Sequence, residues 1–301
     1  MFIFANMSKK ELSILMPSYN NTCVLLVKEL AEQCSNLEGL RYEIIVADDG
    51  STNYKSISKN REINKIDCCR YIERKVNTGR ATIRNFLVQT ARYANIIFLD
   101  SDVKIEKDDF VLDYLDTDCD GVIYGAIHND RSAYNPCNLR CVYECEFETK
   151  NPASVRNTKP YQQFRTTNFM APRDVLLRFP FDEGFKEYGY EDVLFGKTMM
   201  DNNIKLLHID NPVIVDDYDS NEEFIDKTQQ ALRTLYTHRK EMDGYSGVIS
   251  ASKLIHRCMM DIPMKCAYRM YGERIYRKLC SNNPSIFLFN VYRMMYYISQ
   301  K

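Results

Sequence analysis

Three short apolar segments in the first hundred residues each stop at a turn that carries polar side chains. Leu12 to Met16 ends at Pro17, Tyr42 to Ala47 ends at Asp48-Asp49-Gly50, and Ile96 to Leu99 ends at Asp100-Ser101-Asp102. Short apolar runs with such boundaries are typical of buried strands. Between the first two runs, residues 22–34 carry apolar side chains at helical spacing. This β-α-β pattern predicts a parallel sheet covered by helices, with ligands at the carboxyl ends of its strands.

The rest of the chain continues this pattern and then changes. Residues 69–73 are predicted as a strand and 79–92 as a helix, whereas 104–220 mixes short strands with a polar, weakly periodic stretch at 129–161. From residue 221 onward the spacing is helical. We therefore expect a main domain at 1–220, with a nucleotide-binding half at 9–103 and an acceptor half at 104–220, followed by a helical extension at 221–301.

Charge and hydropathy exclude two classes of protein. Among 301 residues, 40 Lys and Arg oppose 41 Asp and Glu, so there is no electrostatic basis for binding nucleic acid. No apolar run approaches the ~18 residues of a membrane span, and the N-terminal apolar segment is too short for a signal peptide. The expected location is the cytoplasm.

The cysteines are numerous but scattered. All 11 lack CxxC spacing, which favours reduced, partly buried thiols. Cys137, Cys141 and Cys145 have four-residue spacing, so a thiolate metal site is an alternative for these three, although it lacks a clear fourth ligand.

Asp100-Ser101-Asp102 places two carboxylates at a strand end. Carboxylates so placed can hold Mn²⁺ or Mg²⁺ while leaving coordination positions for diphosphate oxygens. Acidic residues also populate ordinary strand-to-loop turns, so this triplet alone does not decide between the two interpretations.

Four further segments provide the context, and they occur in a characteristic order. They are Pro17-Ser18-Tyr19-Asn20, Ala47-Asp48-Asp49-Gly50-Ser51-Thr52, Asn77-Thr78-Gly79 with Arg84-Asn85, and Phe181-Asp182-Glu183-Gly184-Phe185 with Gly189-Tyr190-Glu191-Asp192. Over residues 12–217 this set resembles family 2 of the glycosyltransferases, which are inverting enzymes. The resemblance implies the GT-A fold, a Rossmann-like mixed α/β sheet flanked by helices, here with a C-terminal helical extension.

The resemblance also implies a donor site. Its residues would be Pro17, Tyr19, Asn20, Asp49, Asn77, Gly79, Arg84, Asp100 and Ser101. Asp49 would accept from the imide N–H of uracil, which favours a UDP-sugar donor. The alternatives are a plain capped turn at 48–51 and a surface position on a helix for Arg84.

Asp192 is the expected catalytic base for the acceptor hydroxyl. By resemblance, Glu191 either hydrogen-bonds the acceptor or exchanges roles with Asp192. The alternative is that both acids merely cap a helix N-terminus and interact with its dipole.

The metal site departs from the family pattern. Relatives often have a metal-binding His where this chain has Val215, so Asp102 and Asp100 are expected ligands together with Asp216, or else Asp217. His208 is interpreted mainly as a packed histidine. Asn168 is a candidate sugar contact or a turn cap.

The helical extension carries many basic residues among Tyr, Met and Ile side chains. Such helices are candidates for peripheral contact with the inner face of the plasma membrane, or they pack on their own domain with a solvated basic face.

The leading interpretation is an inverting glycosyltransferase of surface polysaccharide or glycoconjugate assembly. Its partners would be a nucleotide-sugar donor and a glycan or lipid-linked glycan acceptor, with no nucleic acid. A nucleotidyltransferase is disfavoured because no Gly-rich phosphate loop follows the first strand. A catalytically degenerate sugar-nucleotide-binding protein is the other alternative. The transferred sugar, the acceptor and the oligomeric state do not follow from the sequence.

Overall fold

The computed structural model describes residues 9–184, 189–215 and 218–300, which form two compact units. Within these residues, unit 1 comprises 9–128, 152–184 and 198–215, and unit 2 comprises 129–151, 189–197 and 218–300.

Unit 1 is built on a seven-stranded mixed sheet with the order β3-β2-β1-β4-β7-β5-β8. The strands are β1 (Glu11–Ser18), β2 (Arg41–Asp48), β3 (Cys69–Glu73), β4 (Asn95–Leu99), β5 (Val122–Tyr124), β7 (Asn168–Pro172) and β8 (Leu206–His208). Strand β7 is antiparallel to both β4 and β5, and the other neighbouring pairs are parallel. Strands β6 (Ile127–Asn129) and β9 (Val213–Val215) form a separate pair. The predicted fold class is confirmed.

The core of unit 1 explains why its strands read as continuous apolar runs. Residues Leu12, Ile14, Leu15 and Met16 of β1 have no exposed surface, as expected for a strand covered on both faces. Helices α1 (Val24–Ser35) and α3 (Arg80–Thr90) bury their apolar stripes. The shorter helices are α2 (Tyr54–Asn60), the 3₁₀ helix η1 (Arg61–Lys65), α4 (Phe110–Asp116), α6 (Ala153–Arg156) and α7 (Arg173–Arg178).

The strand order reverses beside β1. Because β2 and β4 lie on its two sides and all three strands are parallel, Ser18, Asp48 and Leu99 end at the same edge of the sheet. Ligands of open α/β sheets bind at such a switch point. The sheet therefore brings three of the predicted motifs together.

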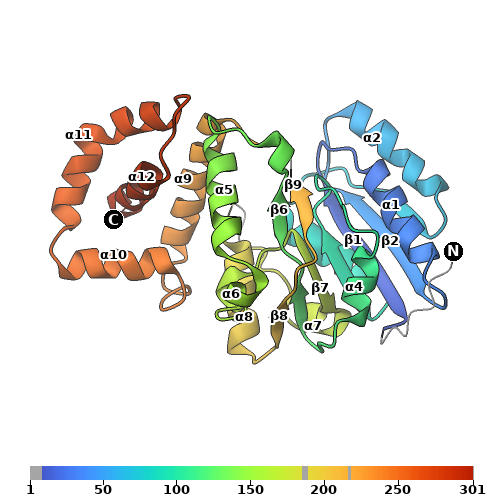
Figure 1. Cartoon of the computed structure of the whole chain (residues 1–301). Helices are drawn as coiled ribbons and strands as arrows, with labels where there is room; N and C mark the ends of the chain where they lie inside the picture. The colour runs from blue at the N-terminus through green and yellow to red at the C-terminus, as the bar shows by residue number, and fades with distance from the viewer. Residues whose placement is uncertain (1–8, 185–188, 216–217, 301) are drawn as a thin grey trace. The chain divides into compact units, whose positions relative to one another are not determined.

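Unit 2 is helical (Figure 1). It contains α5 (Leu139–Lys150), the first residues of α8 (Glu191–Asp201), α9 (Asn221–Thr237), α10 (Gly247–Arg257), α11 (Asp261–Leu279) and α12 (Ile286–Ser299). Helix α12 packs on α11, α9, α10 and α5. The sequence did not predict α5 because its stripe is narrow: only Leu139, Cys141 and Cys145 are buried.

Candidate functional site

Asn20 ties the loop after β1 to the loop after β2. Its Oδ1 accepts from the backbone N–H groups of Thr52 and Asn53 at 2.8 Å each, and its own N–H donates to Ser51 Oγ at 2.7 Å. The neighbouring Tyr19 is 49% exposed. The loop therefore uses Asn20 internally and presents the ring of Tyr19 to solvent.

Asp49 is buried and holds the loop after β3. Its carboxylate accepts from the backbone N–H groups of Thr78 (3.1 Å) and Gly79 (2.9 Å), and from Arg74 Nη1 (3.1 Å). Asn77 Oδ1 also accepts from the Gly79 N–H at 3.1 Å. Because a carboxylate offers about four lone-pair positions, most of the capacity of Asp49 serves the 74–79 loop.

The turn at 48–51 has its own internal support. Asp48 accepts from the Ser51 N–H at 2.7 Å and from the Tyr71 hydroxyl at 2.9 Å, and burial raises the pKa of Tyr71. Gly50 has φ +74°, and a Cβ at this position would lie 2.5 Å from the backbone N of Asn77. The turn and the 74–79 loop are therefore packed backbone to backbone, which requires glycine.

Arg84 is the most unusual charge in unit 1. Its side chain is 3% exposed, and its Nη2 donates to Asp100 Oδ1 at 3.0 Å. Its Nε and Nη1 are buried without a hydrogen-bond partner in the described part of the chain, although the guanidinium lies 5.8 Å from the centre of the Phe181 ring. A surface position for Arg84 is thus wrong. Buried N–H groups of a cation without partners are costly, so a bound anion at this position would offset that cost.

Two asparagines that the sequence analysis did not assign organise the same edge. Asn21 Nδ2 donates to the backbone oxygen of the buried Ser101 at 2.6 Å, and Asn60 Nδ2 donates to the backbone oxygen of Asn21 at 2.8 Å. Asn60 has no exposed surface. Only the fold brings these distant residues together, although an Asn-Asn pair directly after a strand is a usable signal.

Asn85 connects α3 to the segment that precedes the acceptor motif. Its amide exchanges hydrogen bonds with the backbone of Phe181 at 2.9 Å in each direction, and it donates to Glu183 at 2.9 Å. This contact explains structurally why an asparagine follows Arg84.

The two expected metal ligands of unit 1 lie where β4 ends. The side chain of Asp100 is 27% exposed, and Asp102 is exposed. Asp216, like Asp217, lies outside the described residues. Across 9–184, 189–215 and 218–300 no cluster of three or more His, Cys, Asp or Glu is preformed. The oxygen-only pair that is present fits a hard divalent cation that also takes ligand oxygens from phosphate.

Glu191 and Asp192 begin α8 in the part assigned to unit 2. Asp192 Oδ1 accepts from the Val193 N–H at 2.8 Å, so this carboxylate contacts the helix terminus. The capping interpretation thus has a structural basis. A capping contact does not exclude chemistry at the same carboxylate.

Two other sequence candidates are structural. Asn168 is fully buried and bonds Tyr114, Ala126 and Asn211, so the sugar-contact prediction is wrong. His208 is packed as predicted: its Nδ1 accepts from Arg156 at 3.1 Å, and burial lowers its pKa to about 4.

The cysteine triplet gives no support to a thiolate site. Cys141 and Cys145 are buried, and burial raises the pKa of Cys145 to about 11, which keeps the thiol protonated.

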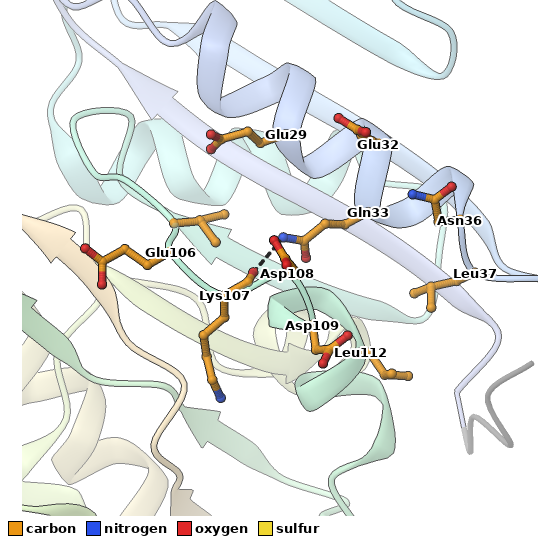
Figure 2. A pocket seen from close by; sticks show the side chains of 11 residues that line it. Glu29, Glu32, Gln33, Asn36, Leu37, Glu106, Lys107, Asp108, Asp109 and Leu112 are labelled. Carbon is orange, nitrogen blue, oxygen red and sulfur yellow. Dashed lines mark hydrogen bonds between the residues drawn. The ribbon is translucent and has the colours of Figure 1, made fainter. Parts of the chain in front are cut away.

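A hollow of about 310 Å³ lies elsewhere in unit 1, between the second half of α1 and residues 105–112 (Figure 2). Gln33 crosses it, donating to the Lys107 backbone oxygen at 2.8 Å. None of the predicted site residues lines it.

None of the helices in the described part of the chain is both long and apolar enough to cross a membrane.

Comparisons with known proteins agree with this architecture. Residues 13–181 match the model of glycosyl transferase family 2. An uncharacterized glycosyltransferase of Haemophilus influenzae is 36% identical over 97 residues, which cover 32% of this chain and 38% of that protein. Chondroitin synthase of Pasteurella multocida is 26% identical over 218 residues, which cover 62% of this chain and 22% of that protein. The chain thus spans well under half the length of these curated relatives.

A solved structure extends the likeness to the fold. The mannosyltransferase PcManGT of Pyrobaculum calidifontis, in complex with GDP-Man and Mn²⁺, has a TM-score of 0.56 and 14% identity, covering 95% of this chain and 84% of that one. The mixed sheet and its site define a glycosyltransferase with the GT-A fold. The family match covers more than half of the chain, and the chain belongs to glycosyltransferase family 2.

Proposed function

We propose that this protein is an inverting transferase that moves one sugar from a nucleoside-diphosphate donor, UDP-linked, to an acceptor hydroxyl. The observation that carries the proposal is the buried Arg84 beside Asp100, with two nitrogen atoms that have no hydrogen-bond partner among the residues that the structure describes. A diphosphate is the anion that a guanidinium at a strand switch point suits best, because it accepts paired hydrogen bonds.

The proposed reaction is a single displacement. Asp192 takes the proton of the acceptor hydroxyl, and the acceptor oxygen forms a bond to the anomeric carbon. The bond between that carbon and the diphosphate oxygen breaks on the opposite face, and its electron pair leaves with the nucleoside diphosphate. The configuration inverts because attack and departure occur on opposite faces. Arg84 donates to the oxygens on which negative charge grows.

Asp100 and Asp102 are the residues that would hold Mn²⁺ or Mg²⁺, with Asp216 proposed as a further oxygen ligand. Such a cation neutralises charge on the leaving diphosphate. Val215 occupies the position where relatives often have a His ligand, so the proposed set consists of oxygens only.

We propose Tyr19 as the main contact to the nucleobase. Its exposed ring offers a face for stacking. A uracil imide would share Asp49 with the donors from residues 74–79 that already contact it. The choice of UDP rests on the family resemblance, whereas the named ligand of PcManGT is GDP-Man.

A thermal-shift screen against UDP, GDP, CDP and TDP, each with Mn²⁺ or with EDTA, tests the donor site. The expected result is stabilisation by UDP that depends on the metal. Sugar-linked forms of the nucleotide that binds are then assayed for release of the nucleoside diphosphate. Binding without release would support a catalytically inactive nucleotide-sugar-binding protein, and no response to any nucleotide would overturn the proposal.

For the acceptor, we propose a glycan or lipid-linked glycan of surface polysaccharide or glycoconjugate assembly, met at the cytoplasmic face of an anionic membrane. Residues 247–279 contain seven Lys and Arg but only two Asp and Glu. Met259, Ile262 and Met270 are 86%, 74% and 70% exposed. Exposed apolar side chains on a segment with an excess of basic residues complement an anionic lipid surface.

Flotation with vesicles tests this contact. Binding is expected to vesicles that contain about one-third phosphatidylglycerol and not to pure phosphatidylcholine, because each basic residue contributes about 1 kcal/mol near an anionic surface. Arg269→Glu with Arg274→Glu should abolish flotation, whereas the matched double variant Lys55→Glu with Lys59→Glu on α2 should not. Equal binding to both vesicle types would overturn the proposal.

A further inference from the structure

The residues just before the proposed base have a backbone that must be held in place. Gly189 has φ +98° and Tyr190 has φ +67°. A bulky residue in the left-handed region is conformationally strained. A Cβ on Gly189 would lie 2.5 Å from the Cβ of Ala231, so the chain here presses directly on α9.

Arg293 of α12 holds Tyr190 from a second side. Tyr190 packs on the core that contains Tyr296 and Tyr297 of this helix. The Arg293 guanidinium is close enough to interact with the Tyr190 side chain, and its Nη1 donates to the Tyr143 hydroxyl of α5 at 3.2 Å. It also lies 5.7 Å from the centre of the Tyr143 ring and 5.5 Å from that of Phe289. Its Nε is buried without a hydrogen-bond partner within residues 9–184, 189–215 and 218–300, so burying this charge is costly.

The first turn of α8 adds an apolar contact. Val193 and Leu194 pack against a core formed by helices of the same unit. That core contains Leu232, Leu235, Met242, Ile249, Tyr296 and Tyr297. Because the Leu194 N–H also donates to the Tyr190 backbone oxygen at 3.0 Å, the orientation of Tyr190 sets the start of the helix that carries Glu191 and Asp192.

We propose that Arg293 is a positioning residue for the transfer reaction: it holds Tyr190, and through Tyr190 it orients the carboxylate of Asp192. The C-terminal helices thereby build the acceptor-side carboxylate site. This inference rests on the proposed function, in which Asp192 is the base. Misplacing a reacting group by about 1 Å costs about 10²-fold in rate.

A double-mutant cycle tests the coupling without knowledge of the natural acceptor. Release of the nucleoside diphosphate to water is measured for Arg293→Met, Asp192→Asn and the double variant, with the nucleotide sugar selected by the donor screen. Arg293→Met should lower kcat about 10- to 100-fold with an unchanged donor KM. In the Asp192→Asn background, Arg293→Met should not lower kcat further, because the base is already absent.

Matched variants separate positioning from folding. Arg178→Met removes an exposed arginine at the end of α7 and should leave kcat unchanged. Tyr190→Phe keeps the packed ring and loses the hydroxyl that Arg293 contacts, so it should lower kcat with an unchanged Tm, even where Arg293→Met unfolds the chain. Arg293→Lys should restore part of the rate, since it retains the charge.

The outcomes distinguish the two proposals. Near-normal release by Asp192→Asn would overturn the base assignment itself. If Asp192→Asn lowers kcat strongly while Arg293→Met and Tyr190→Phe leave kcat unchanged, only the positioning role is overturned. An equal loss from Arg293→Met in both backgrounds would likewise overturn it.

Discussion

Arg84 Nη2 donates to Asp100 Oδ1 at 3.0 Å, and the two residues differ sharply in their exposure to solvent. The arginine side chain is 3% exposed, whereas the aspartate is 27% exposed. The ion pair therefore has one desolvated partner and one partner that solvent and ligands can reach. Since Nε and Nη1 of Arg84 also have no partner among the described residues, the pair is expected to contribute little to stability, and we predict that it binds an anion.

Replacing Arg84 should separate function from stability. Arg84→Met removes a buried cation and leaves Asp100 partly hydrated, so Tm should stay the same or rise. Affinity for the nucleoside diphosphate should fall at least about tenfold, since hydrogen bonds to charged groups contribute about 1.5–3 kcal/mol. Calorimetric titration with thermal unfolding checks both. A parallel loss of Tm and affinity would contradict a ligand-directed role.

Asp102→Ala should abolish the metal-supported part of donor binding. Removing one of the few proposed carboxylate ligands strongly weakens the binding of a divalent cation. Nucleotide affinity with Mn²⁺ should fall to the value measured in EDTA. Asp108→Ala, an exposed acid beyond the same strand, is the control. Metal-dependent affinity that survives Asp102→Ala would move the cation site elsewhere.

Gly50→Ala should destabilise unit 1 more than Gly39→Ala does. Both glycines have positive φ, +74° and +79°, so each alanine carries a conformational penalty of about 1–2 kcal/mol. Only at Gly50 would the new Cβ also meet backbone, at 2.5 Å from Asn77 N, whereas nothing lies within 4 Å at Gly39. Urea unfolding of both variants gives the difference. Equal losses would show that the 74–79 loop moves aside freely.

His208 should make stability depend on pH. Burial lowers its pKa from 6.5 to about 4, so the folded state holds the neutral ring and the unfolded state binds the proton first. This contribution is complete above pH 6.5 and is lost as pH falls towards 4. Between pH 7.5 and 5 the loss is about 2 kcal/mol by linkage. In urea unfolding, His208→Gln should lose correspondingly less stability over that interval than the unsubstituted protein. Identical pH profiles of the two proteins would refute the assignment.

Much of unit 1 follows from local pattern. The strand at 69–73 is predicted with its observed bounds, and the runs at 12–16, 42–47 and 96–99 lie inside β1, β2 and β4, because strands buried on both faces read as continuous apolar segments. Helix α5 is not predictable in this way, since its narrow buried stripe produces almost no periodicity.

The individual roles of polar residues are a different matter. From the sequence, the polar side chains of Asn20, Asp49 and Asn168 are equally good candidates for ligand contacts. In the structure Asn168 is buried and forms hydrogen bonds to three distant segments of the chain. The sequence is compatible with Arg84 as either a surface residue or a phosphate ligand. Its burial in the structure excludes the surface position.

The amino-acid sequence by itself determined the family, the order of the first strands and the turns at which polar groups collect, because hydropathy period and turn chemistry are local properties. Only the tertiary structure decided how the hydrogen-bonding groups of these side chains are used. Asp49 accepts hydrogen bonds from the protein itself, whereas Arg84 has N–H groups without a partner among the described residues. The physical reason is that desolvation and hydrogen-bond satisfaction depend on residues far apart in the chain, which only packing brings within reach.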